Sequence, residues 1–223
     1  GAILVDFMML LSGFCLFLPY AREMVYGEKA PGALTFYRKR IARIAPSYYV
    51  SILIVLFCFA LPLGEYASGT AFWKDFVPHL FFVHNFFPEA HIYTHLNGAL
   101  WTVAVEMQFY LLFPLLARCF QKKPVLTYAC MVAVGLLSGS WISEHYDTLY
   151  QSMYVNHTLT FFSVFANGML GAWAYVSMNK ERIRNKAEEM LFLLLTIGGC
   201  WLFKMMCEHR SRYISDTRWQ IDY

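Results

Sequence analysis

The chain has 223 residues, of which 58% are hydrophobic and only 15% charged, and its formal net charge is +3. Soluble domains usually carry about 25% charged residues. Twenty Phe, fifteen Tyr and six Trp also exceed what a soluble core of this size needs. This composition argues against a soluble globular protein. The basic residues lie in loops without interleaved aromatic side chains, so no nucleic-acid partner is expected.

Apolar runs of roughly membrane-spanning length recur along the chain. They cover residues 3–19, 45–63, 96–117, 125–142, 158–176 and 190–206. Each run lacks a polar face over most of its length, unlike the amphipathic helix of a soluble protein. We therefore predict an all-α fold, a polytopic transmembrane helix bundle with about six crossings. Residues 1–223 would form a single membrane domain.

The charges between these runs predict the orientation of the bundle. Lys and Arg number six in residues 20–44, one in 64–95, three in 118–124, none in 143–157 and four in 177–189. High and low counts alternate, as the positive-inside rule requires. Loops 20–44, 118–124 and 177–189 are therefore expected in the cytoplasm of a multi-pass protein of the plasma membrane.

Both ends of the sequence look cut. The chain begins with Gly1 inside an apolar run, and its final basic residues break the alternation of charge. We expect an internal piece of a larger membrane protein, truncated at the N-terminus and also at the C-terminus.

Near the N-terminus, one carboxylate and one small-residue pair stand out in the first run. Asp6 lies near the expected outer end, where a structural pairing or helix-capping role is favoured. Ser12 and Gly13 lie two turns deeper, where small residues allow close helix approach. Packing is the favoured interpretation of this pair, and Ser12 is also a candidate to line a substrate path.

The basic connection that follows predicts a helix boundary. Thr35 is a possible cap for a short helix. Pro46 is incompatible with an unbroken continuation of that helix and suits the first position of the next one. The amides of Ser47 and Tyr48 would then lie at a helix N-terminus, a position that favours anions.

Three arginines in this connection have two interpretations. Arg40 and Arg43 are three residues apart and would share a helix face, with Arg38 beside them. Clustered basic residues next to a membrane helix usually set topology and contact lipid headgroups. Alternatively, arginine forks match phosphate oxygens. A cytoplasmic donor with several phosphates, coenzyme A above all, would then bind here.

The outer connection, residues 64–95, is rich in histidine. His91 and His95 are four apart, a possible metal pair if helical, but no carboxylate or thiol lies at a matching spacing. The cysteines form no C-x-x-C pair. No metal site is expected.

The next apolar run contains a carboxylate, Glu106, at a depth where a charge costs several kcal/mol and is normally paired, protonated or used. On a helix, Thr102, Glu106 and Tyr110 form one stripe, and Trp101 and Gln108 lie on another face. Polar atoms on two faces predict that neighbouring helices surround this segment. Glu106 is a candidate general base toward a hydroxyl, an orienting partner for another side chain, or a structural helix–helix contact.

Three motifs together, residues 5–14, 36–46 and 100–114, resemble the membrane-bound acyltransferase-3 family. They cover roughly the first half of the chain. Beyond Gln121 only the hydropathy is consistent with the family. Met8 and Met9 replace the Phe pair that is usual there, a change that preserves packing.

The resemblance implies an integral membrane enzyme, in bacteria a protein of the inner membrane. It would pass an acyl group, often acetyl, from cytoplasmic acyl-CoA to a hydroxyl of a cell-surface glycan or lipid-linked sugar, without a bound cofactor. It implies that the basic motif, here Arg40 and Arg43, holds the donor and that Glu106 belongs to the catalytic centre. The family's catalytic histidine lies on a helix that would precede Gly1, so this fragment alone is expected to be inactive. Taken together, the substrate-binding residues predicted for this chain are Ser12, Arg38, Arg40, Arg43, Trp101 and Tyr110.

Two other functions compete with this interpretation. A transporter also has intramembrane carboxylates, although paired broken helices in two related halves are not evident here. A non-catalytic membrane scaffold with a buried carboxylate is the third possibility.

Overall fold

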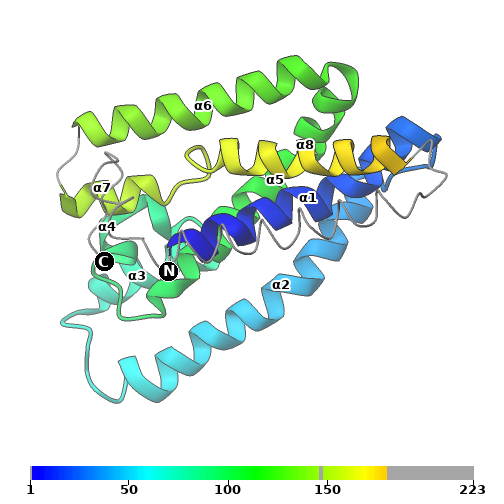
Figure 1. Ribbon diagram of the computed structural model, residues 1–223. Helices are drawn as coiled ribbons and strands as arrows, with labels where there is room; N and C mark the ends of the chain where they lie inside the picture. The colour runs from blue at the N-terminus through cyan, green and yellow to red at the C-terminus, as the bar shows by residue number, and fades with distance from the viewer. Residues whose placement is uncertain (1, 146–147, 180–223) are drawn as a thin grey trace.

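A computed structural model describes residues 2–145 and 148–179, and this part of the chain is helical without any strand. Five long helices dominate it (Figure 1). They are α1 (Ala2–Tyr26), α2 (Ala33–Val55), α5 (Trp101–Lys122), α6 (Pro124–His145) and α8 (Phe162–Asn179). The prediction of an all-α bundle is confirmed.

Short elements connect the long helices at one end of the bundle. They are η1 (Leu56–Ala60), α3 (Gly69–Leu80), η2 (His84–Phe86), α4 (Pro88–His91), η3 (Gly98–Leu100) and α7 (Thr148–Val155). We call residues 64–100 the cap. In Figure 1 the cap helices and α7 gather at the end where the chain begins.

Four of the described helices are long and apolar enough to cross a membrane. They are Leu4–Tyr26, Ala33–Ala60, Gly98–Lys122 and Pro124–Ile142. Large apolar side chains are exposed on their outer faces, as contact with lipid requires; examples are Leu4, Met8, Phe57, Leu115 and Val125. Of the other two predicted crossings, 158–176 corresponds to α8, and 190–206 lies outside the described residues.

The connections that were predicted to be cytoplasmic lie together. In Figure 1 the α1–α2 connection, the α5–α6 connection and the end of α8 share the end of the bundle opposite the cap. We call it the basic end. Arg118 of α5 lies 3.4 Å from a Glu23 carboxylate oxygen of α1 there. The helices therefore alternate in direction as the charge pattern predicts.

Two glycines set the closest helix approach in the bundle. A Cβ added to Gly13 of α1 would lie 2.5 Å from the Phe165 carbonyl oxygen, and one added to Gly168 of α8 would lie 2.2 Å from the Leu10 carbonyl oxygen. Such distances are far below van der Waals contact, so neither helix tolerates a side chain at its crossing point. The predicted packing role of the Ser12–Gly13 pair is confirmed.

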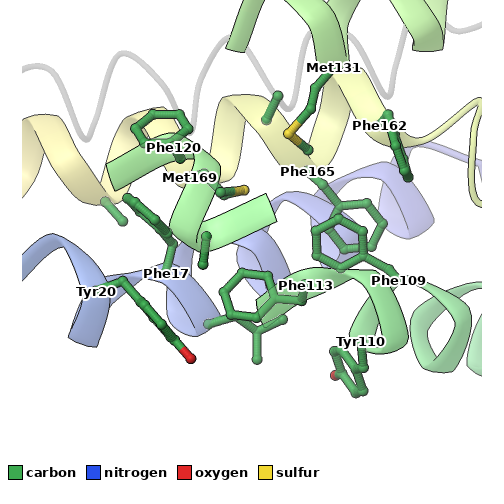
Figure 2. Close-up of a cluster of buried hydrophobic side chains, with 14 of the residues drawn as sticks. Phe17, Tyr20, Phe109, Tyr110, Phe113, Phe120, Met131, Phe162, Phe165 and Met169 are labelled. Atoms are coloured by element: carbon green, nitrogen blue, oxygen red, sulfur yellow. The ribbon is translucent and has the colours of Figure 1, made fainter. Parts of the chain in front are cut away.

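Aromatic rings fill the space between α1, α5 and α8 (Figure 2). Phe109 and Phe165 stack with ring centroids 3.5 Å apart, and Phe17 meets Phe120 edge-on at 4.7 Å. All four side chains are fully buried. Tyr110 lies at the edge of this cluster in Figure 2, and its hydroxyl donates to a Glu106 carboxylate oxygen.

The predicted helix boundary at Pro46 is wrong. Helix α2 runs unbroken through this proline, and its N-cap is Gly32 without any side-chain cap, so Thr35 lies inside the helix. A proline removes only one backbone hydrogen bond, a loss that a helix packed in a membrane bundle tolerates. The amides of residues 47 and 48 therefore belong to a helix interior, and the expected anion site at a helix N-terminus does not exist.

Candidate active site

A hydrogen-bonded trio of side chains joins α1 to α5 inside the bundle. The Ser12 hydroxyl donates to Glu106 Oε1 over 2.8 Å, and the Tyr110 hydroxyl donates to the same oxygen over 2.7 Å. The two hydroxyl oxygens lie 3.5 Å apart. None of the described residues donates to Glu106 Oε2. One carboxylate oxygen is thus doubly occupied, while the other keeps its capacity to accept a proton.

The sequence folds into this arrangement for local reasons. Glu106 and Tyr110 are one helical turn apart, so their side chains meet on one face of α5. Ser12 reaches them because Gly13, its neighbour, lets α1 settle deeply into the bundle. The predicted stripe is therefore confirmed for two of its members. Its third, Thr102, donates to the carbonyl of Ala99 instead.

A second polar group on another face of α5 also finds protein partners. The Gln108 amide nitrogen donates to the Phe82 carbonyl and to Asn85 Oδ1, both over 2.8 Å. The Thr158 hydroxyl donates to Gln108 Oε1 over 2.7 Å. The inference that neighbouring segments surround α5 on more than one side is confirmed. These bonds attach the cap to the helix that carries Glu106.

Arg40 lies beside the trio rather than at the surface. Its guanidinium carbon is 5.7 Å from the Phe36 ring centroid and 5.8 Å from the Tyr110 ring centroid, distances at which a cation interacts with an aromatic face. Its Nε is buried and has no hydrogen-bond partner among the residues that the structure describes. Buried guanidinium nitrogens are normally paired, so this donor is suited to an oxygen from a ligand.

The other predicted binding residues do not join this group. Arg38 and Arg43 are exposed, and neither pairs with a described carboxylate. A spacing of three residues leaves Arg43 about 60° around the helix from Arg40, which is enough to turn one side chain inward and the other outward. Trp101 packs near Phe161, with ring centroids 6.1 Å apart. The predicted residues that the structure brings together are Ser12, Arg40, Glu106 and Tyr110.

Asp6 is not part of the trio. It lies in the second turn of α1, beyond the first-turn amides that a capping residue would serve, and its side chain is exposed. No described residue forms a hydrogen bond or an ion pair with it. The predicted capping role is wrong, because Asp6 lies inside α1.

The cap contains a buried carboxylate, Asp75, that the sequence did not indicate. Asp75 accepts hydrogen bonds from the Tyr66 hydroxyl at 2.9 Å, the Thr94 hydroxyl at 2.8 Å and the His95 backbone amide at 2.9 Å. It is only 2% exposed. The signal available in the sequence was weak: Asp75 is the one aspartate in residues 64–95.

Two cap histidines form a buried stack. The rings of His79 and His84 are nearly parallel, with centroids 4.0 Å apart. His79 Nδ1 donates to the Asp75 carbonyl over 2.8 Å, and each Nε2 is buried without a partner. Burial lowers the pKa of His79, and burial together with the neighbouring histidines lowers the pKa of His84 to about 2. Both rings are therefore neutral.

The remaining histidines have separate environments. His91 has its pKa lowered to about 4, first by burial and then by His157 and His79. His95 faces Glu65, with its Nδ1 3.4 Å from Oε2. Among the described residues, no group of three or more His, Cys, Asp or Glu side chains is arranged to hold a metal ion.

The chain is similar to known membrane acyltransferases. A family profile described as an acyltransferase domain, of the acyltransferase-3 type, matches residues 1–215. The chain is 36% identical over 128 residues to the acyltransferase MdmB of Streptomyces mycarofaciens, covering 56% of this chain and 30% of that protein.

It is also 27% identical over 122 residues to the peptidoglycan O-acetyltransferase OatA of Listeria monocytogenes, covering 50% of this chain and 19% of that protein. The matches thus span less than a third of either relative. No solved structure matches the chain. With nearly its whole length matched by the profile, the chain belongs to the acyltransferase-3 family of membrane proteins.

Proposed function

We propose that this chain forms the membrane part of an acyltransferase that moves an acyl group, acetyl above all, from cytoplasmic acyl-CoA to a hydroxyl at the outer face. The observation that carries the proposal is the doubly hydrogen-bonded Glu106 inside an apolar bundle, with Arg40 close by. The name of one relative, a peptidoglycan O-acetyltransferase, supports a glycan or lipid-linked sugar as the acceptor. The protein would lie in a bacterial inner membrane.

Glu106 is assigned as the proton acceptor of the reaction. A carboxylate at this depth is costly unless it is paired or used. Its Oε1 is held by Ser12 and Tyr110, which fixes the orientation of the group, and its Oε2 receives no bond from the described residues. A positioned base of this kind typically accelerates a reaction by about 10²–10⁴-fold.

Arg40 is assigned to the donor. It lies about 10 Å along α2 from the first residue of that helix, at 1.5 Å per residue. Arg40 is therefore on the side of the trio that is nearer the basic end of the bundle. An acyl-CoA entering from this end would meet Arg40 before Glu106. The unpaired Nε suits a phosphate or thioester oxygen. Arg43, exposed on the same helix, has no such role in this scheme.

The test uses full-length protein in sealed vesicles supplied with radiolabelled acetyl-CoA on the side of the basic end. Label should reach hydroxyl groups of a glycan enclosed on the cap side. Glu106→Gln should remove this transfer, whereas Glu89→Gln, in an exposed ion pair with Lys74, should preserve it. An active Glu106→Gln protein, or accumulation of unmodified substrate across the membrane, would overturn the proposal and favour a transporter.

Donor binding is measured in the same vesicles. Arg40→Ala should raise the KM for acetyl-CoA, and Arg43→Ala is the matched control on the exposed side of α2. Equal effects of the two substitutions would remove the donor site from Arg40.

A further inference from the structure

We infer that Ser12 is a nucleophile that carries the acyl group between donor and acceptor. This inference rests on the proposed function and adds a covalent intermediate to it. Its basis is the hydrogen bond from the Ser12 hydroxyl to Glu106, at 2.8 Å, inside the bundle. A serine hydroxyl is a weak nucleophile by itself, and an adjacent base within hydrogen-bond distance is the usual means of activating it.

The surroundings of this hydroxyl complete a nucleophilic site. Tyr110 has its hydroxyl 3.5 Å from Ser12 Oγ; once Glu106 has taken the Ser12 proton, this hydroxyl can give up its bond to Glu106 and donate to the oxygen that becomes negative when a carbonyl is attacked. The Arg40 guanidinium lies over the Tyr110 ring and adds positive charge on the same side. Nucleophile, base and two donors are thus contributed by three helices, α1, α5 and α2.

The depth of Ser12 provides the reason for a relay. It lies about 15 Å along α1 from Ala2 and about 21 Å from Tyr26, at 1.5 Å per residue. Neither end of the bundle is close to it. The donor enters at the basic end, and the acceptor remains at the cap end. The two need not meet if a side chain between them carries the acyl group as a covalent intermediate.

The backbone holds this hydroxyl in place. Gly13 is pressed against the Phe165 carbonyl, and Gly168 against the Leu10 carbonyl, so α1 cannot rotate or slide at Ser12 without a clash. Fixed geometry between a nucleophile and its base is a large part of catalytic power. A hydroxyl that served only to join two helices would not need this precision.

In the first half-reaction, Ser12 Oγ attacks the thioester carbonyl, and its proton passes to Glu106. The Oγ–C bond forms and the C–S bond breaks. The coenzyme A thiolate leaves and takes the proton from Glu106. The products are an acyl-serine ester and free coenzyme A thiol.

In the second half-reaction, the acceptor hydroxyl attacks the acyl-serine carbonyl and gives its proton to Glu106. The acyl–Oγ bond breaks, and Ser12 Oγ recovers the proton from Glu106. The acceptor ester leaves toward the cap end. No oxidation or reduction occurs, and the enzyme returns to its starting state.

The experiment uses full-length protein in vesicles with radiolabelled acetyl-CoA and no acceptor. The inference predicts label bound to the peptide that contains Ser12 after an acid quench. It also predicts exchange of labelled free coenzyme A into acetyl-CoA without acceptor, because the first half-reaction is reversible. Ser12→Ala should lose both signals. Ser138→Ala should keep both, because Ser138 is an intramembrane serine of α6 that donates only to the Gly135 carbonyl.

A second variant protects the test against failure of Ser12→Ala to fold. Ser12→Cys retains a nucleophile of similar shape, and its trapped acyl group should be a thioester that neutral hydroxylamine releases. The wild-type ester should resist the same treatment. Transfer to outer hydroxyls by wild-type protein without label or exchange would overturn the relay and leave the proposed function intact. Absence of transfer in every variant would instead overturn the proposed function.

Discussion

Glu106 in the bundle is half-buried and Asp75 in the cap is buried, and the hydrogen bonds to these two carboxylates are arranged in opposite ways. Asp75 in the cap receives bonds on both oxygens, from Tyr66, Thr94 and the His95 amide. Glu106 in the bundle receives both of its bonds on one oxygen. The donors to Asp75 come from within the cap. Those to Glu106 come from α1 and from its own helix.

The comparison separates a structural carboxylate from a reactive one. A buried charge whose lone pairs are all occupied is a fixed part of the fold, and removing it leaves several donors unpaired. A carboxylate with one oxygen that accepts no hydrogen bond contributes less to stability, and that oxygen can still accept a proton. The Nε of Arg40, close to Tyr110, is a second polar atom in the same place that has no hydrogen-bond partner among the described residues. The bundle, rather than the cap, is therefore where chemistry is expected.

The largest expected effect contrasts activity with stability at Glu106. Glu106→Gln should lower acyl transfer by about 10²–10⁴-fold, the usual contribution of a positioned base. Its thermal unfolding midpoint should change little, because the amide oxygen still accepts from Ser12 and Tyr110. Initial transfer rates and unfolding curves on the same preparation measure both. A protein that fails to fold would place Glu106 with Asp75 as a structural group.

For the cap carboxylate we expect a loss of stability, in contrast to the loss of activity expected at Glu106. Asp75→Ala should destabilise the protein by about 3 kcal/mol or more, because unpaired buried donors cost about 1–3 kcal/mol each. Thermal unfolding in detergent, with hydrogen exchange of the cap amides, measures the loss. Asp75→Asn should recover part of it, since an amide oxygen still accepts. An unchanged midpoint in the alanine variant would contradict the structural role.

A smaller effect is expected at the α1–α8 crossing. Gly168→Ala should destabilise by about 1–3 kcal/mol, a typical cost of overpacking, because its new Cβ would meet the Leu10 carbonyl. Gly171→Ala is the matched control: the nearest atom to its Cβ is a Phe14 ring carbon at 3.6 Å, an ordinary contact. Equal unfolding midpoints for the two variants would show that the helices are not in such close contact.

The last expected effect is a dependence of stability on acid. The pKa of His84 is lowered to about 2 and that of His91 to about 4, from an ordinary value of 6.5. Below pH 6.5 these histidines bind protons in the unfolded chain but not in the folded cap. The free energy of unfolding therefore falls as the pH falls, by up to about 1.4 kcal/mol per pH unit for each such histidine.

Unfolding midpoints between pH 7 and pH 5 measure this dependence. His84→Asn should flatten the curve. His145→Asn, an exposed position on α6, should leave it unchanged. A midpoint that rises on acidification would show the opposite linkage and contradict the burial of these rings.

Much of the bundle was predictable because a membrane imposes strict rules. The apolar runs located the four described helices that are long and apolar enough to cross a membrane, although the second of them begins at Ala33, twelve residues before its run. The period of α5 predicted that Glu106 and Tyr110 meet. The two polar faces of α5 correctly implied neighbours on both. Small residues at 12 and 13 correctly indicated a tight crossing, although its partner, Gly168, lies more than 150 residues away and has no local signal.

The failures share a physical cause, which is dependence on contacts between distant segments. Local rules predicted a break at Pro46, but the packed bundle supports a continuous helix. The same rules gave Arg40 and Arg43 a common face, and a rotation of about 60° was enough to separate them. Asp75 was not predicted because its hydrogen-bond partners come from other parts of the cap and reach it only when the cap folds.

The glycine crossing has a consequence for how this protein can diverge. Since Gly13 and Gly168 bring main chain against main chain beside Ser12, no side-chain substitution on either helix can shift the hydroxyl gradually. Substitutions away from this crossing do not bring a side chain against main chain, so the bundle can change there without moving the hydroxyl.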